Sequence, residues 1–214
     1  TNGARPGDPV DEKQPALAGL VSGGKLKMSP DTVDAYAYVQ PYQEPADYAH
    51  RNYCGPGAAT VLLSHWDADY PKNVDIDRLG DQMDIDPNGG VWVRDIVKPV
   101  NDELNAKAGQ DLNWYRLGEA QSLDEFRWML DYDIGQNGVP LITSLQTGGL
   151  PGWGGQDVGH IVAVYGYHKD ADGTEWVTYA DTAPGSAGFE GKTFNTVRLD
   201  TFWHAVSQNS AQVW

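Results

Sequence analysis

The order of predicted helices and strands along the chain constrains its fold more than any other feature of the sequence. Apolar side chains with helical spacing fall mostly in the first half, at about 54–66, 74–83 and 92–104, the last interrupted at Pro99. A further helix is predicted after Ser122, because Glu125 three residues later completes a capping box. Predicted strands are 36–39, 112–116, 139–145, 161–165 and 176–180. Helices and strands do not alternate regularly, so the sequence predicts the α+β class.

Charge and hydropathy narrow the classes of partner. The 214 residues include 30 Asp and Glu but only 15 Lys and Arg, a formal net charge of -15. So acidic a protein would be repelled by nucleic acid and by anionic membranes, and we expect neither as a partner. The sequence contains no run of about 18 apolar residues, so no membrane span is predicted.

The beginning of the chain differs in composition from the rest. Residues 1–30 are rich in Gly, Pro, Ala and charged side chains, and their only apolar patch is 17–21. We therefore predict an N-terminal arm or linker over 1–30 and one folded domain over 31–214. The chain starts at Thr1 without a Met or the apolar core of a signal peptide. Because it is also rich in Trp and Tyr, we expect an extracellular protein whose secretion signal has been removed.

Cys54 is the only cysteine in the chain and lies at the predicted entry of a helix. Pro56 fits the first turn of that helix, where a missing backbone N–H costs nothing. The positive end of the helix dipole favours the thiolate, which is the nucleophilic form of cysteine. The alternative interpretation is a small buried apolar side chain, because free cysteine is often buried. A nucleophilic cysteine also needs a base and a group that orients that base.

His160 and Asp181 are the candidates for these two roles. His160 opens an apolar strand, and Asp181 follows the next strand in the chain. A four-residue turn over 169–172 would pair His160 with Asp181, whose Cβ atoms would then lie about 5 Å apart. A two-residue turn at Asp172-Gly173 would instead place His160 opposite Gly185, and Asp-Gly is common in such tight turns. Each residue alone also has an ordinary structural interpretation, but together with Cys54 they provide a nucleophile, a base and an orienting carboxylate.

These motifs resemble those of the papain-like cysteine peptidases, specifically the bacteriocin-processing type that cleaves double-glycine leaders. The motifs are Tyr53-Cys54-Gly55-Pro56 at a helix entry, Gly159-His160 at the start of a strand, Gly166-Tyr167 at its end and Asp181 after the next strand. The resemblance covers about residue 36 to the C-terminus and is closer to stand-alone secreted relatives than to transporter-fused ones. It implies a papain-like catalytic domain over 31–214, with Cys54 as nucleophile, His160 as base and Asp181 as its orienting group.

The resemblance also implies a glutamine upstream of the nucleophile that helps to bind the oxyanion. Such a residue usually lies about six positions before the cysteine, but position 48 is Tyr. We prefer Gln43, which requires an insertion between it and Cys54, and Gln40 is the other glutamine in this region. The role needs one side-chain donor next to the backbone N–H of Cys54. His50 and Asn52 are nearer in sequence and could also donate.

Two other segments have weaker patterns. Residues 84–95 match a calcium-binding loop, with candidate oxygen ligands at Asp84, Asp86, Asn88 and Asp95. The last position is Asp rather than the usual Glu and Pro87 stiffens the loop, so we favour a turn before a helix and expect no metal or other cofactor. The glycine-rich segment 148–159 contains Trp153 and fits either a mobile lip over a groove or an ordinary loop.

Two functions remain open at this point. The first is a secreted cysteine peptidase that cleaves a peptide or amide bond through an acyl-thioester on Cys54, with a peptide or protein as substrate. The second is a catalytically inactive papain-like module that binds a peptide or protein partner. Reactivity of the Cys54 thiol distinguishes them.

Overall fold

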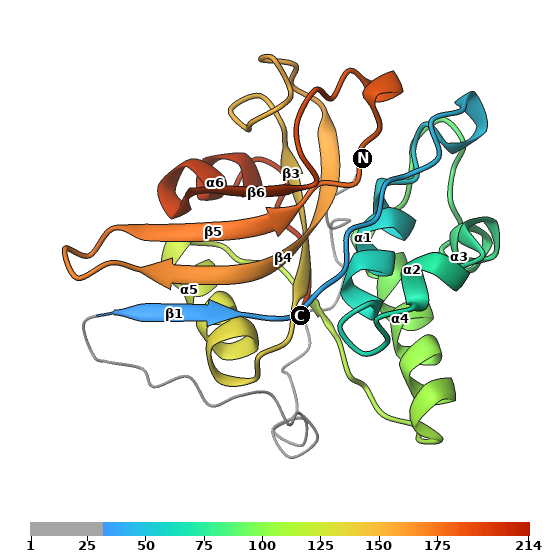
Figure 1. The fold of residues 1–214 in the computed structure, drawn as a ribbon, viewed down its shortest axis with the longest axis horizontal. Helices are drawn as coiled ribbons and strands as arrows, with labels where there is room; N and C mark the ends of the chain where they lie inside the picture. Colours follow the sequence, from blue (N-terminus) through green and yellow to red (C-terminus); the bar gives the residue numbers. More distant parts are fainter. Residues whose placement is uncertain (1–31) are drawn as a thin grey trace.

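The computed structural model describes residues 32–214, in which a seven-stranded sheet separates two groups of helices (Figure 1). The predicted arm, 1–30, lies outside the described residues. The strands are β1 (Val33–Tyr36), β2 (Leu117–Gly118), β3 (Leu141–Gln146), β4 (Gly159–Lys169), β5 (Glu175–Ala180), β6 (Phe194–Arg198) and β7 (Gln212–Val213). The helices are α1 (Cys54–Leu63), α2 (Tyr70–Asn73), α3 (Ile76–Gln82), α4 (Val93–Ala108), α5 (Leu123–Leu130) and α6 (Leu199–Val206). Short helical turns are η2 (Tyr48–His50), η3 (Asp131–Gln136) and η4 (Gly185–Ala187).

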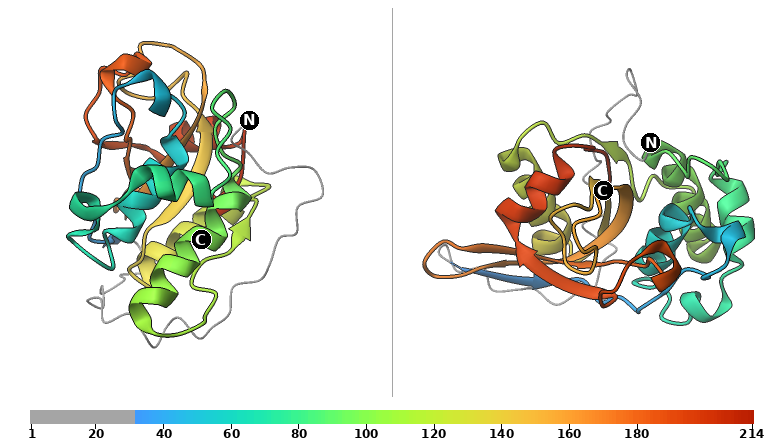
Figure 2. Two further views of the ribbon diagram at one scale, coloured as in Figure 1. Left: turned by 90° about the vertical axis from the view of Figure 1, so that its right-hand side faces the viewer. Right: turned by 90° about the horizontal axis from the view of Figure 1, so that it is seen from above.

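Strand β4 is the centre of the sheet. The strand order is β2-β7-β3-β4-β5-β6, all neighbours are antiparallel, and β1 pairs with the end of β4 that extends beyond β3. Every residue from His160 to Val164 on β4 is buried, because helices cover both faces of the sheet there. Helices α1–α4 lie on one side, and α5 and α6 on the other (Figures 1 and 2). This arrangement confirms the predicted α+β class.

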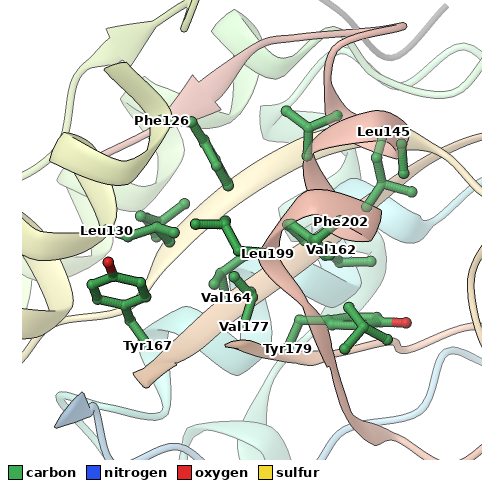
Figure 3. Packing of buried hydrophobic residues seen from close by; sticks show 14 of the residues in the cluster. Phe126, Leu130, Leu145, Val162, Val164, Tyr167, Val177, Tyr179, Leu199 and Phe202 are labelled. Atoms are coloured by element: carbon green, nitrogen blue, oxygen red, sulfur yellow. The ribbon is translucent and has the colours of Figure 1, made fainter. Parts of the chain in front are cut away.

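Two apolar clusters correspond to the two sides of the sheet. The first cluster joins α1, α3 and α4 to one face of the sheet through side chains such as Leu62, Ile96 and Ile161. The second cluster contains α5, α6 and the opposite face, as Figure 3 shows around Phe126, Val162, Val164, Tyr179 and Phe202. Alternate residues of β4 thus belong to different clusters, as the two-residue period of a strand requires.

The hairpin between β4 and β5 follows neither of the predicted registers. Lys169 pairs with Glu175, and the five residues between them include Gly173, which lies in the left-handed region at φ +86°. Tyr165 then forms a bulge that shifts the pairing by one residue, so that Ala163 pairs with Ala180. Asp181 lies beyond the last pair, and its backbone N–H donates to the carbonyl of Thr193. Only its side chain reaches back toward β4.

Several predicted elements change their bounds. The strand predicted at 36–39 is β1 at Val33–Tyr36, and 112–116 is not a strand. Helix α4 is continuous through Pro99, which is buried together with Ile96 and Val100, so burial offsets the lost hydrogen bond. The helix after Ser122 is confirmed, because the Ser122 hydroxyl accepts the N–H of Glu125. None of the helices within 32–214 has both the length and the apolar character needed to cross a lipid bilayer.

Candidate active site

Cys54 is the first residue of α1, and the helix enters the core at that point. The whole helix is buried, and Cys54 itself is only 7% exposed. Gly55 and Gly57 allow this close packing. A Cβ at Gly55 would lie 2.1 Å from Cγ1 of Val91, and one at Gly57 would lie 2.5 Å from Oγ1 of Thr182. The two glycines that flank Pro56 therefore place the start of α1, and its thiol, directly against the end of the sheet.

His160 and Asp181 meet at that end of the sheet. Nε2 of His160 donates to Oδ1 of Asp181 at 2.8 Å, which leaves Nδ1 for the hydrogen bond with the Cys54 side chain. His160 is 4% exposed and Asp181 1% exposed. The structure therefore brings together the three residues that the motifs predicted. Their contact is between side chains, not between directly opposed strand positions.

Trp153 completes the environment of the histidine and the carboxylate. Its indole N–H donates to Oδ2 of Asp181 at 2.9 Å, and its ring meets the His160 ring edge-on with centroids 5.0 Å apart. Trp153 is buried and also packs on Phe189, 5.3 Å between centroids. Of the two interpretations of segment 148–159, the structure therefore favours an ordered loop at this residue. The sequence showed only a tryptophan in a glycine-rich loop, and this pattern does not predict a hydrogen bond from Trp153 to Asp181.

The charges of this pair stabilise each other. Burial alone would lower the pKa of His160, but the Asp181 carboxylate and the hydrogen bond with Cys54 raise it well above its ordinary value. Burial alone would raise the pKa of Asp181, but His160 and the N–H groups of Ala183 and Trp153 lower it. The site therefore favours an imidazolium next to the cysteine sulfur, which is the charge state that stabilises a thiolate.

A cavity of about 400 Å³ gives access to these side chains. One wall comes from the helical side of the fold and consists of Glu44, Arg51, Asn52, Cys54 and residues 88–90. The other wall comes from the sheet side and consists of Trp153, residues 158–160, Ala183 and Ala187. The nucleophile candidate and the base candidate thus face a common space from opposite walls.

The structure differs from the sequence prediction at the expected oxyanion donor. Gln43 is exposed and is not among the residues that line the cavity, whereas the adjacent Glu44 is buried and does line it. The N–H of Glu44 donates to the carbonyl of Thr182 at 2.9 Å, which turns its side chain inward and that of Gln43 outward. This segment has no periodic apolar pattern, so the sequence did not indicate which of the two neighbours faces the site.

The other donor candidates have separate partners. The Gln40 amide donates to the Tyr38 hydroxyl, and His50 lies between Asp47 and Asp77 at 2.8 and 2.9 Å. Asn52 does line the cavity, and its amide donates to the carbonyl of Pro87 at 2.6 Å.

Part of the segment that matches a calcium-binding loop, residues 88–90, lines the cavity. Within the described part of the chain, no group of three or more His, Cys, Asp or Glu side chains is placed to hold a metal ion. Asp86 accepts the N–H of Asn88, and Asn88 accepts a hydrogen bond from Arg51 at 3.0 Å. Asp95 lies in α4 and pairs with Arg94. These contacts fit the favoured interpretation, a turn before a helix, with the turn facing the cavity.

Comparison with protein families gives a match over most of the chain. The model described as Peptidase_C39 like family matches residues 33–211, which include Cys54, His160 and Asp181. None of the curated protein sequences compared with the chain matches it.

Solved structures similar to this one include papain-like cysteine proteases. The bromelain protease from Ananas comosus in complex with the E64 inhibitor has a TM-score of 0.53 at 10% identity, over 86% of this chain and 98% of that one. A recombinant stem bromelain precursor has a TM-score of 0.52 at 11% identity, over 97% of this chain and 74% of that one. The ragweed pollen allergen Amb a 11 in its proform has a TM-score of 0.53 at 12% identity, over 87% of this chain and 65% of that one. At such identities the likeness shows the fold, which is papain-like.

Proposed function

Because this chain belongs to the Peptidase_C39 like family, we propose that it is a cysteine peptidase that hydrolyses a peptide bond through an acyl-thioester on Cys54. One observation carries the proposal. The His160 ring joins the Cys54 side chain on one side to the Asp181 carboxylate on the other, at the edge of an open cavity. A merely structural histidine would not need a thiol and a carboxylate on its two nitrogens beside a space that admits a ligand.

The chemistry follows from this arrangement. The Cys54 thiolate attacks the carbonyl carbon of the substrate, a C–S bond forms, and the carbonyl oxygen takes up the displaced electron pair. The oxyanion then collapses, the C–N bond breaks, and the imidazolium of His160 gives its proton to the departing amine. A water molecule, deprotonated by His160, attacks the thioester and releases the acid product and Cys54. Asp181 holds the ring in orientation throughout, because its bond to Nε2 fixes which nitrogen faces the sulfur.

For the substrate, we propose a secreted peptide or protein with small residues, such as a double glycine, before the scissile bond. The support is the resemblance of the Cys54, His160 and Asp181 motifs to the bacteriocin-processing peptidases. We also propose that the protein acts outside the cell, on the basis of its Trp-rich and Tyr-rich composition.

The second candidate is a papain-like module that binds a peptide without cleaving it. One observation favours it: the buried side chain beside the nucleophile helix is the carboxyl of Glu44 rather than an amide. An ionised carboxylate at that place would repel the oxyanion of the reaction.

Reaction of the full chain with a peptide that contains an internal Gly-Gly distinguishes the two functions. The peptidase should release a product that ends in Gly-Gly, and mass spectrometry of an acid-quenched sample should find the acyl group on Cys54. Cys54→Ala should abolish both signals. Binding of the peptide without cleavage by the wild-type protein, across pH 4–9, would support the binding module and contradict the peptidase.

A further inference from the structure

A carboxylic acid is buried in the wall of the candidate active site, where the reaction needs a hydrogen-bond donor. Glu44 is 6% exposed, and it lines the same cavity as Cys54 and His160. Its side chain lies against the first turn of α1, because a Cβ built at Gly57 would be 3.0 Å from its Cγ and 3.1 Å from its Oε1. The oxyanion of the proposed reaction forms close to this turn, next to the backbone N–H of Cys54.

The contacts of Glu44 show which oxygen is free to act. The hydroxyl of Thr182 donates to Oε1 at 2.5 Å, and the carbonyl of Thr182 accepts the N–H of Glu44 at 2.9 Å. Thr182 thus holds both the backbone and the side chain of Glu44. Because Oε1 accepts a hydrogen bond, a proton on the carboxyl group belongs on Oε2, and from there it can be donated to a ligand.

We propose that Glu44 is a catalytic residue that donates a hydrogen bond to the oxyanion in its protonated form, and that its ionisation switches the enzyme off as the pH rises. This inference rests on the proposed peptidase function. The carboxylic acid replaces the amide of the expected glutamine, and it differs in one respect. An amide donates at every pH, whereas a carboxyl group donates only while it keeps its proton.

The charged groups around Glu44 come from three other parts of the fold. Cys54 and Arg51 line the cavity from the helical side, His160 faces it from β4, and Asp181 follows β5. The guanidinium of Arg51 donates to the carbonyl of Tyr48 and to Asn88, and within residues 32–214 it makes no hydrogen bond or ion pair with Glu44.

These surroundings keep the proton on Glu44 up to neutral pH. Burial raises the pKa of Glu44 from 4.5 to about 7, and the negative charge of Asp181 acts in the same direction. The charge of His160 and the hydrogen bond from Thr182 oppose this rise without cancelling it. The nearby Tyr42 is neutral over the same range, because burial and Glu44 raise its pKa to about 12.

The test compares Glu44→Gln with the wild-type protein in two reactions of the same thiol. The first is hydrolysis of the p-nitrophenyl ester of N-acetyl-Gly-Gly, which passes through an oxyanion. The second is alkylation of Cys54 by iodoacetamide, a substitution at a saturated carbon that forms no oxyanion. Glu119→Gln is the matched control, because it removes a carboxyl group that lines a different cavity.

Hydrolysis by the wild-type protein should fall about tenfold per pH unit above pH ~7, as the fraction of protonated Glu44 falls. Glu44→Gln should not show this fall, so its rate relative to wild type should rise at least ~10-fold from pH 5 to pH 9. The relative alkylation rate should change less than ~3-fold over the same range, and Glu119→Gln should follow the wild type in both reactions. A relative hydrolysis rate that does not change with pH, with Cys54 still alkylated, would overturn the role of Glu44 and leave the peptidase standing.

The stability of the two proteins tests the protonation of Glu44 without reference to activity. Its pKa is raised on folding, so the wild-type protein loses stability as the pH rises from about 4.5 to about 7, and Glu44→Gln does not share this loss. The Tm of the variant relative to wild type should therefore be higher at pH 8 than at pH 5. A constant difference would overturn the proposal whether or not the protein hydrolyses the ester. Should Glu44→Gln fail to fold, wild-type hydrolysis that stays level to pH 9 would overturn it instead.

Failure of the proposed function itself has a different signature. In that case neither the wild type nor Glu44→Gln hydrolyses the ester or the Gly-Gly peptide at any pH, although both melt cooperatively. That outcome overturns the catalytic role of Glu44 together with the peptidase.

Discussion

The two walls of the cavity are held in place in different ways. On the sheet side, His160, Asp181 and Trp153 are buried and bonded to one another, and Phe189 packs behind the indole. On the helical side, Cys54, Glu44 and Gly90 are buried. The rest of that wall depends on solvent-accessible hydrogen bonds, such as those from Arg51 to Asn88 and from Asn52 to the carbonyl of Pro87.

This difference separates two functions of the walls. Buried, charge-assisted hydrogen bonds are strong and costly to break, so the sheet side fixes the orientation of the base. Exposed hydrogen bonds between side chains contribute little each, so the rim of the helical side can adjust to a ligand. We therefore expect substitutions on the sheet side to reduce turnover, and substitutions at the helical rim to alter substrate binding.

Among substitutions that retain the nucleophile, the largest effect should come from Asp181→Asn. The amide cannot stabilise the imidazolium as a carboxylate does, and it favours the wrong ring tautomer of His160. We expect kcat for the Gly-Gly peptide to fall about 10²- to 10⁴-fold, and Cys54→Ala to lose more, because Asp181→Asn retains the nucleophile. Steady-state kinetics at several substrate concentrations measure this. A changed KM with an unchanged kcat would contradict the assignment of His160, on the sheet side, as the catalytic base.

The same substitution should change how stability depends on pH. The pKa of His160 is raised on folding. Its contribution to the stability of the fold is therefore complete below about pH 6.5 and is lost as the pH rises through the pKa of His160 in the folded protein. The pKa of Asp181 is lowered on folding. Its contribution to the stability of the fold is therefore complete above about pH 3.8 and is lost as the pH falls through the pKa of Asp181 in the folded protein. The Tm difference between wild type and Asp181→Asn should therefore be largest between about pH 4 and 6.5. Equal differences at pH 5 and pH 9 would show that the pair is not ionised in the folded protein.

A smaller effect is expected from Trp153→Phe. The substitution keeps an aromatic ring against His160 and removes the indole N–H that donates to Asp181. Loss of one hydrogen bond to a charged group should cost about 1.5–3 kcal/mol of stability, and kcat should fall roughly tenfold. Trp128→Phe is the control, since Trp128 is 53% exposed. Equal losses in both variants would mean that Trp153 acts only through its bulk.

The smallest effect should follow from Arg51→Gln on the helical rim. It removes the positively charged guanidinium, which donates hydrogen bonds to the carbonyl of Tyr48 and to Asn88 at the edge of the cavity. We expect KM to rise about two- to threefold with kcat nearly unchanged, because an exposed contact contributes only ~0.5 kcal/mol. A loss of kcat comparable to that of Trp153→Phe would remove the distinction between the two walls.

The sequence was informative where a residue type and its local setting imply the chemistry. A lone cysteine at a helix entry and a histidine at the start of an apolar strand are local signals, and the structure brings Cys54 and His160 together. Contact with Asp181 was also expected, but from the register of a four-residue turn, which the hairpin does not adopt. A bulge at Tyr165 and the five-residue loop over 170–174 set the actual pairing, and neither has a reliable signature in the sequence.

Contacts that depend on the whole fold could not be predicted. Whether Gln43 or Glu44 faces the cavity is decided by a backbone hydrogen bond to Thr182, 138 positions away from Glu44. The indole of Trp153 reaches Asp181 only because the 148–159 loop folds over the sheet end. The continuity of α4 through the buried Pro99 likewise depends on the surrounding fold, which local propensity does not include.

The central claim is that His160 activates the Cys54 thiol, and the rate of alkylation by iodoacetamide against pH tests it most directly. In the wild-type protein, the imidazolium held by Asp181 should stabilise the thiolate, so that Cys54 reacts readily at pH 6. His160→Asn removes the positive charge, and its alkylation at pH 6 should be at least ~10-fold slower, with the two rates converging above pH ~9. Equal rates for the two proteins at pH 6 would contradict the claim that these residues form a catalytic pair.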